Sequence, residues 1–460
     1  MRPIRPIPST WIALALLVGS AWGCGHDAVA PEDTSANDEP QVIPSVATAW
    51  LRAHVHTFDT SVPSEDLSDL EFLRDIVGNA RVVSLGEATH GTREFHEMKD
   101  HILRYLVERM GFTGFALEAT WPEGNRLDAY VRTGVGEPAS LLSGMYFWTI
   151  RSQAVMNMIG WMRRTNAAGT PVGFYGFDMQ YPGMALENVV RFFGEAGPEL
   201  LPGVEGRLAC LRPYVNDSHG AFPQPGYETV SEADRNACYR DLSWVHDTLG
   251  VLRDELTPRA GADAFERALR SARLLVQFEE LYSGRRDRDA AMAENALWLL
   301  DQLGPDGKLV LWAHNAHVST SRNRMGQRLR EVLGDDLVTV GFTFARGSFM
   351  AVSQTGQSYY AFEEHFADAP PPDSYEAYFH STYLPRFVLD LRGREPTSDS
   401  TSWLHAPLRY RFIGAAYNRN YPQAFFIQSD MCRDFDVVVY FAETTATRIL
   451  PSIRPDSFYP

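Results

Sequence analysis

The sequence predicts an α/β fold: a largely parallel sheet flanked by helices, with an inserted helical subdomain. Two observations lead to this class. Short apolar runs alternate with helical segments along most of the chain, which is typical of a parallel sheet. Residues from about 185 to 300 interrupt that alternation with helical patterns only. The 460 residues are 45% hydrophobic and 22% charged, a composition usual for a globular protein.

The expected elements follow in chain order. Two amphipathic helices, at about 50–54 and 67–77, precede the first strand. A helix at about 94–110 follows that strand, and another helical stretch follows the second. The strands are expected at 81–85, 114–117, 171–177, 308–313, 337–344 and 436–441. The helices of the insert are expected at 187–193, 231–252, 264–282 and 290–303.

The N-terminus has the pattern of an export signal. Arg2 and Arg5 precede an apolar run and a small-residue stretch, which predicts a signal peptide over residues 1–23. Cys24 then resembles the acylated residue of a bacterial lipoprotein, although Ala21 stands where such sites usually carry Leu; ordinary cleavage nearby is the alternative. Residues 24–43 are acidic and Pro-containing and are expected to be a disordered tether before one domain over 44–460. The predicted location is periplasmic or outer-membrane-anchored, otherwise secreted, with membrane contact only through the anchor.

Charge and cysteine content narrow the partners. The formal charge of −16, without a basic stripe, argues against nucleic-acid binding and leaves a small molecule as the expected partner.

Cys210 and Cys238 bracket a loop-like stretch, which favours a disulfide between them. The alternative is that these two and Cys432 are all buried thiols. No Cys/His finger spacing is present, so a structural zinc is not expected. The oligomeric state is left open.

Polar side chains follow four of the expected strands. Because the carboxyl ends of parallel strands share one edge, these residues should meet there. A single carboxylate after a strand is usually a helix cap. Four strands ending this way favour a shared site instead. The residues concerned are Glu87, His90, Glu118, Asp178, His314 and His317.

Histidine beside carboxylates suits general-base chemistry on water. A second carboxylate crowded close by would have a raised pKa and could act as an acid. No G-x-S-x-G elbow supports a serine nucleophile, and no H-E-x-x-H motif occurs. No cofactor is required as a first expectation. A divalent metal is an alternative, with Glu87, His90, Glu118 and His314 as candidate ligands.

The motifs around these residues resemble those of the erythromycin esterase family, which includes proteins named for succinoglycan biosynthesis. The similarity covers about residues 50–445, nearly the whole of the expected domain. It is carried by several blocks in order: Gly86-Glu-Ala-Thr-His-Gly-Thr-Arg-Glu-Phe95, Phe115-Ala-Leu-Glu118, Phe174-Tyr-Gly-Phe-Asp-Met-Gln180, Arg288-Asp289, Met292-Ala-Glu-Asn295 and Trp312-Ala-His-Asn-Ala-His-Val318.

The resemblance implies hydrolysis of an ester or macrolide-type lactone, a reaction that underlies antibiotic resistance, by water activated at His90. Glu87 and Glu118 match the essential carboxylates, and His314 and His317 the second histidine cluster. Lys99 stands where macrolide esterases carry Arg, so substrate anchoring is expected to differ. The other expected substrate-binding residues are Arg93, Asp178, Trp148 and Arg288. Trp148 is expected to line an apolar substrate cleft, and core packing is the alternative. Arg288 is expected to form an ion pair with Asp289 that closes the helical insert over the site, and a plain surface pair is the alternative.

Three functions therefore compete. The first is an exported hydrolase that uses histidine-activated water. The second is a metal-dependent hydrolase that uses the same residues as ligands, and metal analysis separates it from the first. The third is a non-catalytic ligand-binding lipoprotein of the envelope, which would return its ligand chemically intact.

Overall fold

The computed structural model describes residues 43–451 except 146, 216–226, 356–357 and 395–399. The predicted signal peptide, Cys24 and almost all of the tether lie outside the described residues. Within the described part of the chain, no helix is both long and apolar enough to cross a membrane.

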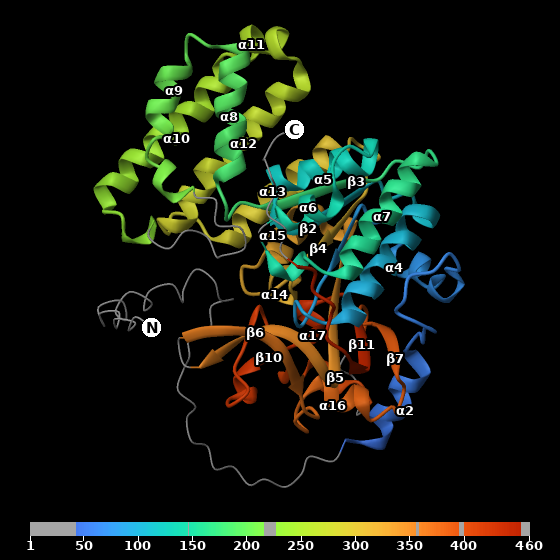
Figure 1. Cartoon of the computed structure of the whole chain (residues 1–460). Helices are drawn as coiled ribbons and strands as arrows, with labels where there is room; N and C mark the ends of the chain where they lie inside the picture. The colour runs from blue at the N-terminus through green and yellow to red at the C-terminus, as the bar shows by residue number, and fades with distance from the viewer. Residues whose placement is uncertain (1–42, 146, 216–226, 356–357, 395–399, 452–460) are drawn as a thin grey trace, which may run out of the picture.

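A nine-stranded sheet forms the centre of the molecule (Figure 1). The order along its main path is β3-β2-β4-β1-β5-β11-β7, and all neighbours are parallel except β7 beside β11. The predicted α/β class with a largely parallel sheet is confirmed. The strands of this path are β1 (Val82–Leu85), β2 (Gly114–Thr120), β3 (Gly173–Asp178), β4 (Leu309–Trp312), β5 (Leu337–Thr355), β7 (Arg386–Asp390) and β11 (Val437–Thr444).

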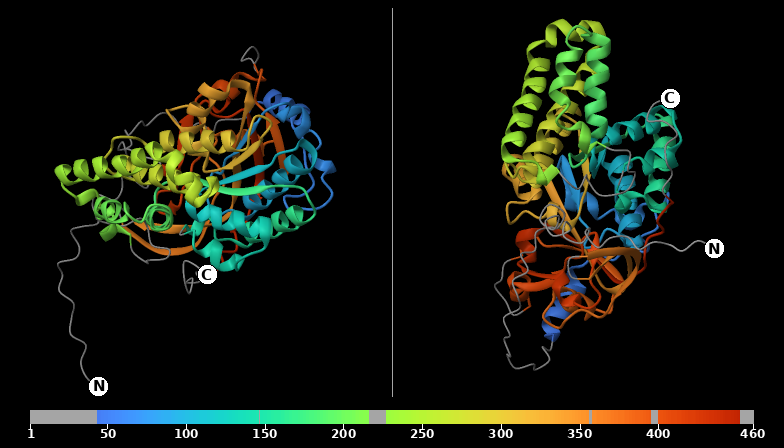
Figure 2. Two further views of the ribbon diagram at one scale, coloured as in Figure 1. Left: turned by 90° about the horizontal axis from the view of Figure 1, so that it is seen from above. Right: turned by 60° about the vertical axis from the view of Figure 1, so that its left-hand side comes forward.

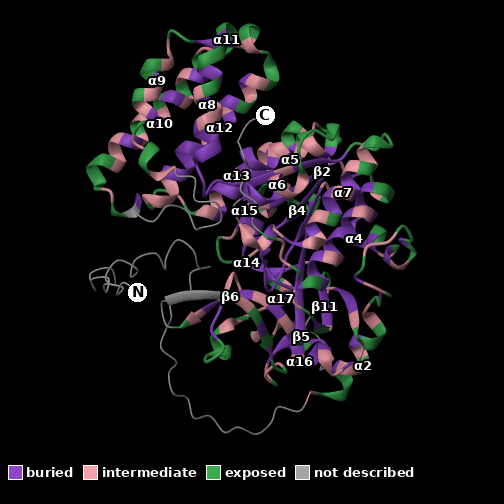
Figure 3. Ribbon diagram, viewed as in Figure 1, coloured by how far each residue is buried: buried purple, intermediate pink, exposed green. Residues whose placement is uncertain are grey.

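Helices cover the sheet on both sides (Figure 2). The central strands β1 and β4 are buried along their whole length, which explains their uninterrupted apolar runs. Figure 3 shows the same burial around the sheet, with exposed residues gathered on the outer helix faces. The covering helices are α2 (Ser45–His54), α3 (Leu73–Val77), α4 (Arg93–Met110), α5 (Trp121–Thr133), α6 (Pro138–Ser143), α7 (Gln153–Ala167), α13 (Arg288–Gln302), α14 (Asn315–Val318), α15 (Met325–Leu333), α16 (Tyr375–His380) and α17 (Met431–Asp434).

The helical insert lies between β3 and α13 and projects away from the sheet (Figures 1 and 2). It consists of α8 (Gly183–Ala196), α9 (Leu201–Leu208), α10 (Glu232–Val251), α11 (Arg253–Ala260) and α12 (Ala262–Tyr282). A disulfide joins Cys210 to Cys238, the pairing that the sequence favoured, and so ties the segment after α9 to α10. The insert ends earlier than expected, because α13 packs against β3 and α15 rather than extending the bundle.

A long hairpin and several short strands in the C-terminal third were not expected from the sequence. β5 runs on past Phe344 and pairs antiparallel with β6 (Ser358–Ala367). The apolar run that predicted its first half ends where buried and half-buried residues begin to alternate. The backbone N–H of Met350 on this hairpin donates to Gly91 O, 3.0 Å away. The remaining strands are β8 (Leu408–Arg411), β9 (Ala416–Tyr417) and β10 (Phe426–Ser429).

Candidate active site

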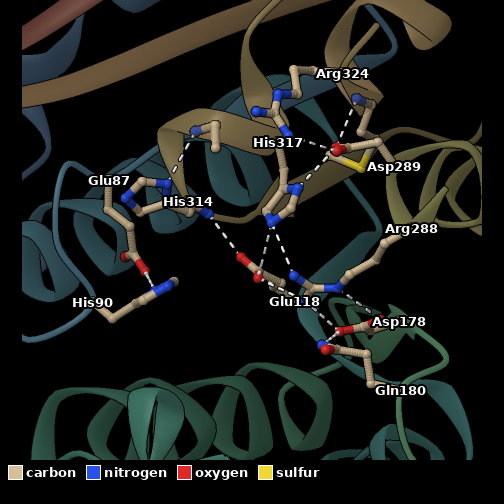
Figure 4. A network of polar contacts seen from close by, with 12 residues as sticks. Glu87, His90, Glu118, Asp178, Gln180, Arg288, Asp289, His314, His317 and Arg324 are labelled. Carbon is tan, nitrogen blue, oxygen red and sulfur yellow. Dashed lines mark hydrogen bonds and ion pairs between the residues drawn. The ribbon is translucent and has the colours of Figure 1, made fainter. Parts of the chain in front are cut away.

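The four strands β3, β2, β4 and β1 are neighbours in the sheet, so the segments at their carboxyl ends lie together. These segments carry the six polar residues that the sequence singled out. Figure 4 shows all six: Glu118 is bonded to the backbone of His314, to His317 and to Arg288, and Arg288 to Asp178, whereas Glu87 and His90 form a pair of their own beside them.

His90 and Glu87 form the first half of the site. His90 Nδ1 lies 2.6 Å from Glu87 Oε1. Burial would raise the pKa of Glu87, but Lys99 and His90 hold it well below its usual value. An ionised carboxylate can only accept, so His90 Nδ1 carries the proton and Nε2 keeps its lone pair. This is the tautomer that a general base needs.

Lys99 does not bind substrate, in contrast to the sequence-based expectation. Its side chain on α4 is wholly buried, and Nζ donates to Glu87 Oε2 at 2.6 Å. Trp312 Nε1 donates to the same oxygen at 2.8 Å, and Nζ lies 4.3 Å above the indole ring. Burial lowers the pKa of Lys99 to about 8, although Glu87 opposes the shift. Lys99 therefore keeps the carboxylate of Glu87 ionised and fixes its orientation.

His96, to which the sequence pattern gave no predicted role, also supports His90. Its Nε2 lies 3.0 Å from His90 O, and its Nδ1 lies 3.0 Å from Ser152 Oγ. Burial lowers the pKa of His96 to about 4, so the ring is neutral and Nε2–H donates to the carbonyl. Its position six residues after His90, in the first turn of α4, was the only signal in the sequence.

Glu118 links His314 to His317 and Arg288. It lies in a register shift of β2 between Leu117 and Thr120, which gives this stretch an irregular strand geometry. Glu118 Oε2 accepts the backbone N–H of His314 at 2.8 Å, and Oε1 accepts Arg288 Nη2 at 2.8 Å. Burial would raise its pKa, but His317 and Arg288 hold it well below its ordinary value. The expected second carboxylate with a raised pKa is therefore wrong for both Glu87 and Glu118.

Arg288 reaches the site from the first turn of α13. Its Nη2 also donates to Asp178 Oδ2 at 2.6 Å, and its Nε to Asp178 Oδ1 at 3.3 Å. Asp178 is fully buried and additionally accepts Gln180 Nε2 at 2.8 Å. Asp178 therefore orients Arg288 and is not itself a substrate contact, which corrects the expectation from the sequence.

His317 carries a positive charge between two carboxylates. Nδ1 lies 2.8 Å from Asp289 Oδ1, and Nε2 lies 3.4 Å from Glu118 Oε1. Burial would lower the pKa of His317, but Asp289 and Glu118 raise it to about 10. The nearby Arg288 Nη1, 3.1 Å from Nε2, opposes this shift without reversing it. Protonated His317 with Arg288 and Arg324 balances the three carboxylates Glu118, Asp178 and Asp289.

Arg288 and Asp289 do not form the ion pair that the sequence suggested. Arg288 bonds Glu118 and Asp178, whereas Asp289 bonds His317 and lies 3.4 Å from Arg324. Adjacent residues at the start of a helix point in different directions, so each takes a separate partner. Neither is a plain surface residue.

His314 has a structural part in the network. Its Nδ1 accepts the backbone N–H of Ala316 at 3.1 Å, and its Nε2–H donates to Ile413 O at 3.0 Å. Burial lowers the pKa of His314 to about 3, so the ring stays neutral. The ring centroid lies 5.1 Å from that of His90. His314 therefore packs beside His90 as a neutral ring with both nitrogens engaged.

The proposed metal ligands do not fit a metal centre. Both ring nitrogens of His314 are engaged by the backbone. Glu87 accepts from His90, Lys99 and Trp312, and Glu118 from His314 and Arg288. Their lone pairs are thus already used by protein donors, two of them cationic, and a divalent ion would have to displace them.

Four of the network's side chains are partly open to solvent: His90 (11% exposed), Glu118 (12%), Arg288 (19%) and Arg324 (26%). These are the groups that a substrate can touch. Arg93 is half exposed and pairs with Glu94 and Glu97 on α4. Trp148 is half-buried and packs on Phe362 of β6, with ring centroids 4.6 Å apart.

Comparison with known proteins identifies the family. The erythromycin esterase family model matches residues 107–444. An erythromycin esterase type II from Escherichia coli is 26% identical over 68% of this chain and 80% of its own length. A putative hydrolase, YbfO, from Bacillus subtilis (strain 168) is 25% identical over 78% of this chain and 84% of its own.

Solved structures share the fold. A protein from Bacillus cereus has a TM-score of 0.77 at 25% identity and covers 88% of this chain and 99% of its own. A succinoglycan biosynthesis protein has a TM-score of 0.75 at 23% identity, over 90% of this chain and 100% of its own. An erythromycin esterase EreC mutant in its open conformation has a TM-score of 0.64 at 19% identity, over 84% and 96%.

The fold and the site thus define a hydrolase of the esterase type. The chain belongs to the erythromycin esterase family.

Proposed function

We propose that this protein hydrolyses a carboxylic ester or lactone by an attack of water activated at His90. The observation that carries the proposal is the 2.6 Å contact between His90 Nδ1 and Glu87 Oε1, with Glu87 held ionised by Lys99. This contact leaves His90 Nε2 able to accept a proton from water. The water oxygen then bonds to the carbonyl carbon.

Glu87 stabilises the imidazolium that forms, and the carbonyl oxygen gains negative charge as the tetrahedral intermediate develops. Arg288 is a partly exposed cation that contacts Glu118, and we assign it as the donor to that oxygen. Glu118 and Asp178 keep its guanidinium in place. Collapse of the intermediate breaks the C–O bond, and His90 returns the proton to the alcohol that leaves. The products are an acid and an alcohol, which remain in one molecule when the substrate is a lactone.

A large apolar lactone of the macrolide type is the proposed substrate class. The E. coli relative is named an erythromycin esterase, which supports an ester inside a macrocycle. Trp148 and Phe362 supply an aromatic wall for such a ligand. Two contacts tie this wall to the neighbourhood of the general base: Met350 N donates to Gly91 O, and Ser152, four residues after Trp148, bonds His96.

We further propose that the protein is exported from the cytoplasm. Export by the N-terminal signal, with Cys24 as a lipid anchor to the outer membrane or with a periplasmic or secreted mature chain, places the enzyme where it meets an incoming antibiotic. Mass spectrometry of the mature N-terminus distinguishes these forms, because acylation adds the mass of fatty chains to Cys24.

Mass spectrometry of a macrolide and of simple esters and lactones, incubated with the protein, tests the activity. The wild type should add one water to its substrate, and His90→Ala should lower the rate by about 10²- to 10⁴-fold without unfolding. Glu87→Gln should act in the same direction. An unchanged rate in His90→Ala would overturn the role of His90. A ligand that binds and returns intact would favour a binding protein.

A further inference from the structure

A second cluster of metal-binding side chain types lies apart from the catalytic network, where the 3-10 helix η6 (Ser402–His405) meets α17. Atoms of His405, Asp430 and Cys432 that can ligate a metal all lie within 4.8 Å of one another. The three residues are neither fully buried nor fully exposed. An ion from solvent can therefore reach them.

His405 is held in the tautomer that a ligand needs. Its Nε2 bonds the backbone carbonyl of Arg394, so this nitrogen carries the proton. In the neutral ring Nδ1 then presents a lone pair, and it lies 3.6 Å from Asp430 Oδ2. That separation is too long for a hydrogen bond and leaves two acceptors facing each other. A histidine fixed by a carbonyl at its far nitrogen is the usual arrangement around bound metals.

Asp430 divides its two oxygens between separate tasks. Oδ1 accepts the backbone N–H of Cys432 at 3.0 Å and caps α17. Oδ2 faces His405 and is left for a cation. The carboxylate is therefore oriented by the helix cap before any ion binds, which lowers the entropy cost of ligation.

Cys432 supplies the third ligand type. Cys210 and Cys238 are bridged to each other, so Cys432 is the free cysteine of the described residues. Arg394 is a cation whose charge acts on Cys432; its Nε donates to Asp390 O at 3.1 Å, and its guanidinium lies over Trp50. These two contacts direct its guanidinium toward other partners.

We propose that His405, Asp430 and Cys432 bind a zinc-class divalent cation, with water completing a four-coordinate site. Nitrogen, carboxylate and thiolate ligands together select zinc over magnesium or calcium, which prefer oxygen alone. His405 and Cys432 are 27 positions apart in the chain, which is why finger-type spacing does not reveal them.

A bound ion would stabilise the residues that follow His314 and His317. α17 carries Asp434, whose Oδ1 accepts Ser319 Oγ at 3.2 Å and whose Oδ2 accepts Tyr410 OH at 2.8 Å. Ser319 lies directly after α14 and two residues beyond His317. The proposed role is therefore to fix α17, and through it the end of α14, rather than to take part in hydrolysis.

Titration of the full chain with Co²⁺ and Zn²⁺ tests this site. We expect one tightly bound ion per chain and, with Co²⁺, a near-ultraviolet sulfur-to-metal charge-transfer band. Cys432→Ser should abolish that band and weaken zinc binding at least 10-fold. Asp430→Asn should weaken it similarly while keeping the helix cap, because Asn also caps helices. Free zinc at 100-fold over the wild-type Kd should raise the melting temperature of the wild type by about 3 °C, and that of a variant with 10-fold weaker affinity by about half as much.

His246→Ala provides the matched control, because His246 lies beside Asp247 on the surface without a thiol. Its zinc affinity and cobalt spectrum should equal those of the wild type. Equal affinity in wild type and Cys432→Ser, or a cobalt spectrum without a sulfur band, would overturn the proposal and leave His405 and Asp430 as an ordinary ion pair.

Discussion

His317 Nδ1 lies 2.8 Å from Asp289 Oδ1, so that the short helix after β4 is joined to the first turn of α13. The contact links two segments 28 residues apart on either side of β4. The contact also holds the protonated imidazole of His317 next to Glu118, so that a buried positive charge lies beside this partly exposed carboxylate. The consequences of this pair can be measured through protein stability as well as activity.

Asp289→Asn should destabilise the protein in a pH-dependent way. Because the pKa of His317 is raised from 6.5 to about 10 in the folded state, its contribution is fully present below pH 6.5 and is lost as pH rises through 10. The variant should lose about 3–5 kcal/mol near pH 6 and much less near pH 10. Chemical unfolding at both pH values measures this. Asp287→Asn is the control, since Asp287 is exposed and Asn keeps its cap on α13; a pH-independent loss in Asp289→Asn would contradict the pairing.

Lys99 should set an alkaline limit on activity. The pKa of Lys99 is about 8, and above it Glu87 loses the cation beside it. The rate should fall with an apparent pKa near 8, and Lys99→Arg should move that fall to higher pH because arginine stays charged.

The free energy of unfolding should rise with pH over the range in which the activity falls. The folded pKa of Lys99 lies below the unfolded value of 10.5, so its buried charge costs about 3 kcal/mol below pH 8, and this cost disappears between pH 8 and 10.5. Lys308→Arg serves as the control, because Lys308 Nζ bonds only the carbonyl of Met110. If activity falls together with unfolding, the assignment to Lys99 fails.

Trp148→Ala and Phe362→Ala should change the response to substrate size. Their rings pack 4.6 Å apart and form the aromatic wall proposed for large esters. KM for a large apolar ester should rise about 10-fold or more, whereas kinetics with a small ester should stay near wild type. Trp244→Ala, in the helical insert, is the control. Equal effects on both substrates would indicate a packing role instead.

Glu123→Gln should stabilise the protein at alkaline pH. Glu123 is buried at the start of α5, and neither of its oxygens has a hydrogen-bond partner among the described residues. Burial raises its pKa to about 7, so folding is weakened as pH rises from 4.5 to 7. The variant should gain about 3 kcal/mol at pH 8 and little at pH 4.5. Urea unfolding checks this, with exposed Glu108→Gln as control; equal stabilities at pH 8 would refute the buried charge.

The sequence determined the central architecture and the residues at its edge. Uninterrupted apolar runs such as Leu309–Trp312 identify strands buried on both faces, and parallel strands bring their carboxyl ends together. This was enough to predict that Glu87, Glu118 and His317 share a site. The family motifs then indicated His90 as the base.

Only the tertiary structure decided what each side chain does. Lys99 points inward to Glu87, Arg288 bonds Glu118 rather than Asp289, and the backbone at Ala316 and Ile413 fixes the ring of His314. The β5–β6 hairpin and the cluster around Cys432 also depend on segments far apart in the chain. The physical reason is that periodicity reports which face is buried, whereas the partner, tautomer and charge of a buried polar group depend on what the folded chain brings within hydrogen-bonding distance.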